Sequence, residues 1–219
     1  MAYRATENTL AKKTAIRQRI VDEARAIVVS GGFSTVSMSV VAKRCGIAIG
    51  TIYRHFGSKA ELLAQIFKYC TEHEVHMVAR AAAEPGLVAT RLQKACLVFG
   101  DRALHSQRLA YALIAEPVDP LVEQQRLIFR HAFGQIFEQL IIEGIASGEL
   151  SALNPGISAA AIVGLLSEIL VSPLTQLSTH SANDPEPLIH TPSGHFTVHE
   201  FITIASQLVC RLVGLEQVK

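Results

Sequence analysis

Two short helical segments separated by a single turn, near the start of the chain, most constrain what this sequence can fold into. The segments cover residues 37–45 and 48–56, and Gly46 provides the turn between them. A longer segment, residues 12–30, precedes them, with apolar residues recurring along one helical face and two glycines at its end. A longer helix followed by two short helices around a glycine turn predicts a helix-turn-helix unit.

Proline and glycine divide the rest of the chain into segments that also have helical periodicity. They cover residues 58–83, 88–104, 107–115, 119–147, 156–171 and 196–214. The polar stretch Ser172–Gly194 predicts a loop, and no alternating strand pattern is present. We therefore predict an all-α fold. A three-helix head occupies residues 1–57 and a helical body residues 58–219, joined by a connecting helix, Ser58–Ala83, which a capping box begins.

The charge of the chain is unevenly distributed. Residues 1–62 contain ten basic and four acidic side chains, a net charge of +6, whereas residues 63–219 have a net charge of −5. A basic head on an acidic body indicates that the head meets a polyanion, although a solvated surface without a partner would have the same balance.

Composition excludes several classes of protein. A hydrophobic content of 49%, with 18% charged residues, is too apolar for a disordered chain. It predicts a partner, a ligand cavity or both. The four cysteines form no CxxC pair, which argues against a disulfide scaffold or a zinc finger. No apolar run precedes Ile16, and the longest one, Ile157–Val171, is shorter than the roughly 20 residues of a membrane span. We expect a cytoplasmic protein without a membrane segment.

The second short helix has the residues of a DNA-reading helix. Ile52 and Phe56 are four positions apart, so we expect both to pack inward. In a helix-turn-helix the second helix enters the major groove. The side chains that stay available for bases and phosphates are Thr51, Tyr53, Arg54 and His55, with Gly50 allowing close approach and Lys59 just beyond.

These residues resemble the DNA-binding head of the TetR family of transcriptional regulators. The most specific piece runs from Gly50 to Phe56, followed by Ser58-Lys59 and Leu62 and preceded by Val41-Ala42 and Cys45-Gly46-Ile47. The resemblance covers about residues 12–65 by motif and the remainder by length and helical layout only. It implies a regulator, most often a repressor, that binds a palindromic operator in double-stranded DNA as a homodimer and responds to a small-molecule effector.

Two positions depart from the family pattern. Ala48 stands where a capping serine is frequent, and Ile49 stands where a polar residue or proline is frequent. An isoleucine can touch a thymine methyl group but cannot donate a hydrogen bond. We therefore expect base readout to depend more on Thr51, Arg54 and flanking Thr35 or Ser37. The full set of expected DNA contacts is Thr35, Ser37, Ala48, Ile49, Gly50, Thr51, Tyr53, Arg54, His55 and Lys59.

The last two helical segments fit the dimer that the resemblance implies. Ala160 and Gly164 lie on one helical line that allows close approach of another helix. In the final segment the candidates are Phe201, Ile204, Leu208 and Leu212. Two such helices could pair with their symmetry copies, but an ordinary core face within one chain would have the same pattern.

The resemblance also implies a ligand cavity in the body. The expected apolar wall residues are Phe67, Phe99, Tyr111, Phe133 and Phe137, and the polar candidates include Arg130, Glu168, Arg126 and Glu116. A stripe of phenylalanines also fits a solid core, and Glu168 also fits a structural ion pair with an arginine of 119–147. If the cavity exists, we expect a largely hydrophobic effector with one polar or anionic end.

Other function classes have weaker support. A regulator without a small-molecule effector, acting through protein contacts, is the main alternative, and a cavity of more than a few hundred cubic ångströms would argue against it. His195 and His199, or His73 and His76, could in principle ligate a metal, but no third ligand has suitable spacing. We expect no metal, no cofactor and no enzymatic activity, since no nucleophile or phosphate-binding motif is present.

Overall fold

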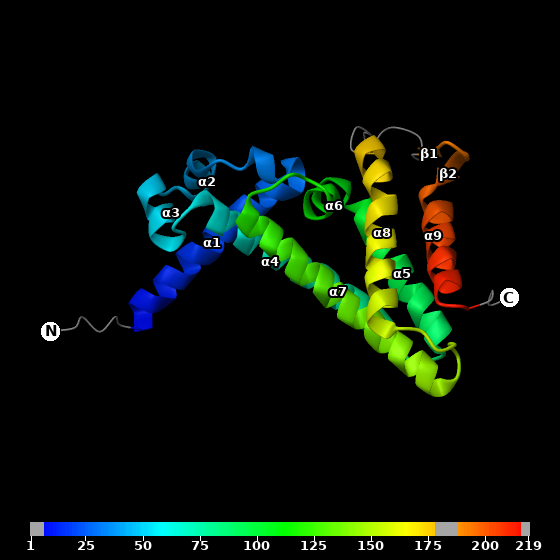
Figure 1. Cartoon of the computed structure of the whole chain (residues 1–219). Helices are drawn as coiled ribbons and strands as arrows, with labels where there is room; N and C mark the ends of the chain where they lie inside the picture. The colour runs from blue at the N-terminus through cyan, green and yellow to red at the C-terminus, as the bar shows by residue number, and fades with distance from the viewer. Residues whose placement is uncertain (1–6, 178–187, 216–219) are drawn as a thin grey trace.

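The computed structural model describes residues 7–177 and 188–215 and is almost entirely helical (Figure 1). The head consists of α1 (Glu7–Gly31), a short 3₁₀ turn η1 (Phe33–Thr35), α2 (Met38–Cys45) and α3 (Ile49–His55). The body follows with α4 (Lys59–Ala82), α5 (Val88–His105), α6 (Gln107–Ile114), α7 (Pro120–Ser147), α8 (Pro155–Leu177), the strands β1 (Leu188–Thr191) and β2 (Gly194–Thr197), and α9 (Val198–Leu212). The all-α prediction is confirmed.

The ends of the head helices follow from local chemistry. Ser37 caps α2 by accepting a hydrogen bond from the Val40 N–H at 3.4 Å, and Gly46 ends the helix in the left-handed conformation with a φ of 62°. Ala48 precedes α3 without any side-chain cap, as its methyl group requires. The helix is therefore held mainly by its buried side, on which Ile52 and the following Phe56 are fully enclosed.

The long helices α4 and α7 pack along each other and carry the connection from the head to the far end of the body (Figure 1). The helices α5, α8 and α9 gather at the end away from the head, where α5 packs on α9 and α8 packs on α7. The head core does not stop at α3. It continues through Leu62, Ile66 and Phe67 of α4 to Phe129 of α7.

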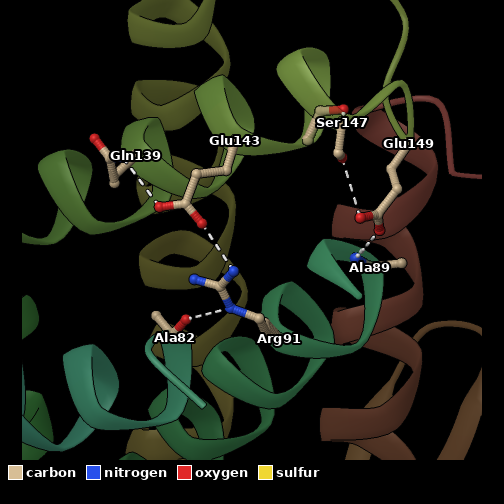
Figure 2. A network of polar contacts seen from close by, with 8 residues as sticks. Ala82, Ala89, Arg91, Gln139, Glu143, Ser147 and Glu149 are labelled. Atoms are coloured by element: carbon tan, nitrogen blue, oxygen red, sulfur yellow. Dashed lines mark hydrogen bonds and ion pairs between the residues drawn. The ribbon is translucent and has the colours of Figure 1, made fainter. Parts of the chain in front are cut away.

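A polar network closes the end of the body opposite the head (Figure 2). Arg91 of α5 donates to the Ala82 carbonyl at 2.7 Å and to Glu143 of α7 at 2.8 Å. Glu149 accepts a hydrogen bond from the Ala89 N–H at 3.3 Å, near the start of α5, which has no side-chain cap of its own. The positive end of a helix favours a carboxylate at this position. The network therefore fixes the corner between α4 and α5 against the end of α7.

Two short strands correct the prediction of a loop over Ser172–Gly194. Residues 188–191 and 194–197 form an antiparallel hairpin in which Ile189 pairs with Phe196 and His190 pairs with His195. Ile189 is fully buried against α8 and α9, so the tertiary contact selects the strand. His195 consequently lies on β2 and not on a helix with His199. Residues 178–187 of the predicted loop lie outside the described part of the chain.

Helix α8 also extends beyond its expected end. We predicted a stop at residue 171, yet the helix continues to Leu177 with Pro173 inside it. A proline inside a helix costs about 3 kcal/mol. Burial of Leu174 on the last turn, and two hydrogen bonds between Gln176 and the backbone of His190, offset that cost. By length and composition alone Pro155–Gln176 could now cross a membrane, contrary to our expectation, but 44% of its most apolar window is buried inside the protein.

Two glycines of α7 provide a matched test of this packing. A Cβ at Gly144 would lie 2.7 Å from the Leu150 side chain, whereas a Cβ at Gly134 would meet nothing within 4 Å. Gly134→Ala should raise the free energy of unfolding by about 0.5–1 kcal/mol, because alanine favours the helix. Gly144→Ala should instead lower it, because overpacking costs about 1–3 kcal/mol. Urea denaturation measures both, and equal stability of the two variants would contradict the packing described.

Candidate DNA-binding surface and effector cavity

Helix α3 presents two large apolar side chains to solvent while two others anchor it. Ile52 and Phe56 are fully buried, as the four-residue spacing predicts, whereas Ile49 and Tyr53 are 44% and 48% exposed. Exposed isoleucine and tyrosine on a short, well-anchored helix are not needed for the core of the head. They are available for contact with another molecule, and the thymine methyl group is a suitable partner for Ile49.

The exposed side of α3 has a linked pair of polar side chains and an open backbone at its first turn. Arg54 donates to the Thr51 hydroxyl at 3.0 Å, so the two side chains already form one unit on the exposed side of the helix. Ala48 and Gly50 are exposed, and nothing lies within 4 Å of a Cβ built on Gly50. The backbone of α3 can therefore approach a ligand closely at its first turn.

The other residues predicted to contact DNA lie before and after α3 in the chain. Thr35 donates its hydroxyl to the Gly32 carbonyl at 2.8 Å, and Ser37 shares a 2.6 Å hydrogen bond with Ser39. Lys59 is exposed on the first turn of α4, directly after Ser58, which caps that helix by accepting from the Glu61 N–H at 3.0 Å. All ten predicted contact residues are thus exposed or half-buried.

Arg17 of α1 positions the end of α3, and the sequence analysis missed it. Its guanidinium donates to the His55 carbonyl at 2.6 Å and lies 4.1 Å from the centre of the Phe56 ring. A cation near a helix C-terminus and over an aromatic face is doubly favourable. A basic residue on the helix before the motif was the signal, but only the fold brings it to α3.

His55 has an unusual environment at the end of α3. Its Nδ1 atom is buried and has no hydrogen-bond partner within the described residues. Burial lowers the pKa of His55, and the positive charges of Lys13, Arg17 and Arg54 lower it further. The free protein therefore favours the neutral imidazole. The negative charge of an approaching phosphate would oppose this shift.

A small cavity lies in the body between α4, α5, α6, α7 and α8. Its volume is about 80 Å³, and its wall is mostly apolar. Five of the predicted residues line it: Phe67, Phe99, Arg126, Arg130 and Phe133. The rings of Phe99 and Phe133 meet edge to face with centres 5.1 Å apart. The cavity is smaller than the roughly 300–1,000 Å³ typical of ligand pockets, so a ligand would have to move its walls.

Four of the predicted residues do not line this cavity, and one of them is Glu116, between α6 and α7. Phe137 is fully buried among α7 neighbours one turn beyond Phe133, where the packing is solid. Tyr111 is half-buried against a separate cluster that includes Leu104 and Ile202. Glu168 is exposed on α8 and makes no ion pair among the described residues. Phe137, Tyr111 and Glu168 each lie on the predicted helix, but on a face that does not border the cavity.

The polar part of the wall is dominated by arginine. Arg102 pairs with Glu74 through two hydrogen bonds of 2.5 and 2.8 Å, an interaction that the sequence analysis missed. Arg126 is buried, which lowers the pKa of its guanidinium, while nearby Glu123 opposes this shift. Arg130 is exposed and forms no ion pair within the described residues. Arg102 and Arg126 are thus paired with Glu74 and Glu123, and Arg130 is left as one positive charge in the cavity wall without an ion pair among the described residues.

The last two helices present the residues predicted for a dimer. Ala160 and Gly164 are exposed on α8, and a Cβ at Gly164 would meet nothing within 4 Å. On α9, Ile204, Leu208 and Leu212 are exposed and Phe201 is half-buried. In Figure 1 the two helices stand beside each other at the end of the body remote from the head. Each helix therefore leaves an apolar or small-residue stripe uncovered in the single chain.

Comparison with known proteins adds independent information. Residues 20–66 match the family described as bacterial regulatory proteins of the tetR family. The HTH-type transcriptional repressor KstR of Mycolicibacterium smegmatis is 40% identical over 76 residues, which are 35% of this chain and 37% of that repressor. The chain thus spans little more than a third of that relative.

Two further comparisons extend over the body. The fatty acid metabolism regulator protein of Bacillus subtilis is 24% identical over 160 residues, which are 70% of this chain and 81% of that protein. The crystal structure of FadR from Bacillus subtilis in complex with stearoyl-CoA superposes with a TM-score of 0.68 at 18% identity, covering 91% of this chain and 99% of that one. At this identity the superposition establishes the fold of the body.

The environment of His55 leads to a pH prediction. Its lowered pKa means that the unfolded chain, with an imidazole pKa of about 6.5, binds the proton more readily than the folded head. The contribution of this group to stability is therefore present above about pH 6.5 and is lost as the pH falls through the folded-state pKa. Denaturation at pH values of about 7.5 and 5.5 should show a smaller loss of stability for His55→Gln than for the wild type. Identical losses would contradict the buried, neutral imidazole.

Proposed function

Since the chain belongs to the TetR family of bacterial regulatory proteins, we propose that it is a cytoplasmic transcriptional repressor that binds a palindromic DNA operator as a homodimer and releases it on binding a small effector. The observation that carries the proposal is the surface of α3, where Ile49 and Tyr53 are exposed on a helix anchored by the fully buried Ile52. A head with a net charge of +6 supplies the attraction to phosphate.

On DNA, α3 would enter the major groove while α2 crosses the backbone. Ile49 and the Thr51–Arg54 pair are the candidates for base contacts, because they occupy the exposed side of α3. Tyr53, His55 and Lys59 are the candidates for phosphate or sugar contacts. The two heads of a dimer would read half-sites separated by one helical turn or more.

For the effector we propose an amphiphile with a long apolar part and one anionic end. The apolar wall and Arg130, which has no ion-pair partner among the described residues, support this class, whereas an uncharged sugar would offer Arg130 no counter-charge. Stearoyl-CoA, bound by the FadR of similar fold, is a molecule of this kind. The cavity volume of about 80 Å³ favours the alternative, a regulator without a small effector, unless the walls move.

Operator binding tests the main proposal. A duplex from the region upstream of its own gene should bind far more tightly than a random duplex at physiological salt, with affinity falling steeply as salt rises. Tyr53→Ala should weaken binding about tenfold, or 1.4 kcal/mol, and Lys59→Ala should reduce the salt slope by about one. Fluorescence anisotropy measures both, with Lys68→Ala on the exposed side of α4 as the control. Equal affinity for the random duplex would refute sequence-specific binding.

The dimer that we propose predicts the effect of a charge on α9. Leu208 is 43% exposed in the single chain, and across a two-fold axis a glutamate there would face its own copy or an apolar partner. Leu208→Glu should therefore yield monomer or aggregate in light scattering and lose operator binding. The control is Ile128→Glu on α7, because Ile128 is also a large apolar residue and is 57% exposed. A stable dimer of the Leu208 variant would place the interface elsewhere.

A further inference from the structure

We propose that the buried carboxylate of Glu116 is a clasp that ties the effector cavity to the DNA-binding head, and that an effector must open this clasp to occupy the cavity. The part of this inference that concerns the effector rests on the function proposed above. The clasp itself is a feature of the protein without ligand. It joins the segment between α6 and α7 to η1, which are 83 residues apart in the sequence.

The head side of the clasp consists of two backbone amides. Oε2 of Glu116 accepts a hydrogen bond from the Phe33 N–H at 2.9 Å, and Oε1 accepts one from the Ser34 N–H at 2.9 Å. Glu116 is only 7% exposed; the bond to Phe33 is buried and the bond to Ser34 is partly buried. Gly32 makes the approach possible, because its φ of 86° suits glycine and a Cβ would lie 2.7 Å from Oε2.

The body side of the clasp is Arg126 of α7. Its guanidinium donates to the carbonyl of Ala112 at 3.3 Å and that of Leu113 at 3.0 Å, both in the last turn of α6. It also donates to the backbone carbonyl of Glu116 itself at 2.7 Å. The same side chain lines the cavity and is only 8% exposed. One arginine therefore borders the cavity and fixes the backbone that carries Glu116.

The size of the cavity makes occupation and the clasp incompatible. A volume of about 80 Å³ holds no molecule of the proposed class, so a wall must move. Helix α6 has only eight residues, whereas the other four walls are helices of 18 to 28 residues. Leu109 and Leu113 of α6 face the cavity. Arg126 also donates to the carboxylate of Glu123. An amphiphile that displaces α6 and whose anionic end replaces Glu123 at Arg126 would pull Glu116 away from Phe33 and Ser34.

This arrangement supplies the differential affinity that a switch requires. With the clasp closed, the head is held as the structure shows and the cavity is small. With the clasp open, the cavity is large and η1 is released. If the closed form binds the operator, any change that weakens the clasp should lower operator affinity and raise effector affinity, because coupling between the two ligands is reciprocal. Substitution of a residue with a merely structural role would lower operator affinity without raising effector affinity.

The test compares Glu116→Gln with Glu149→Gln. Glutamine at position 116 can still accept one of the two amide bonds but would direct its NH₂ group at the other amide. Glu149 is the matched control, since its carboxylate also accepts a backbone N–H (Figure 2). It follows the end of α7, which lies remote from the head (Figure 1). Palmitate serves as the probe and hexadecanol as its uncharged counterpart, with calorimetry for the probe and fluorescence anisotropy for the operator.

We expect palmitate, more than hexadecanol, to weaken operator binding by the wild type at least tenfold. Glu116→Gln should bind the operator three- to thirtyfold more weakly and palmitate more tightly by a comparable factor, while Glu149→Gln should resemble the wild type in both measurements. Reduced operator affinity without a gain in palmitate affinity would overturn the proposal, since it indicates a structural role only. Unchanged affinities for both ligands would overturn it as well.

A second arm needs no ligand and separates failure of the clasp from failure of the proposed function. Hydrogen exchange of the Phe33 and Ser34 amides should be slow in the wild type and in Glu149→Gln. It should be at least tenfold faster in Glu116→Gln and in Arg126→Lys, because the single nitrogen of an ammonium cannot reproduce the guanidinium fork, which reaches the three carbonyls from Nε and Nη2. Unchanged exchange in Arg126→Lys would overturn the link between cavity and head. If that exchange accelerates but palmitate does not bind, the clasp stands and the proposed effector class is wrong.

Discussion

Phe67 is the contact on which the arrangement of head and body depends. Its ring stacks on Phe33 of the head with centres 5.8 Å apart and lies 6.2 Å from the ring of Phe129 of α7. It also borders the cavity and is almost fully buried. Because these three rings belong to one continuous core, the head cannot change its orientation without repacking aromatic side chains at the edge of the cavity.

Polar interactions make this apolar junction directional. Glu116 fixes η1 at the end of α1, Arg126 fixes the end of α6, and Arg17 fixes the end of α3. Each of these bonds joins a side chain to backbone groups, so each determines where a segment lies as well as how firmly it is held. An unpaired backbone group at such a buried position would cost about 1–3 kcal/mol. The geometry of the head is therefore set in part by residues of the body.

The walls of the small apolar cavity differ in how readily they can move. Its walls are four long helices and one short one, and the short helix carries the backbone that Arg126 and Glu116 hold. A ligand cannot enlarge the space equally in all directions, because α4 and α7 pack along each other over much of their length. Movement would concentrate in α6, which contacts α1 of the head.

The sequence by itself determined the helices, the helix-turn-helix and the inward direction of Ile52 and Phe56, because these depend on local spacing, caps and glycine turns. Phe67, Phe99, Arg130 and Phe133, which the sequence suggested for a ligand site, line one cavity. Tertiary structure alone decided that Phe137, one turn from Phe133, lies in solid core and that Glu168 is exposed, because the rotation of each helix against its neighbours determines which apolar face meets a void.

Tertiary structure also kept α8 helical through Pro173 and turned residues 188–197 into a hairpin, since burial of Leu174 and Ile189 outweighs their local preferences. The bonds from Glu116 to Phe33 and Ser34 bring together residues more than 80 positions apart, and no local pattern contains that pairing.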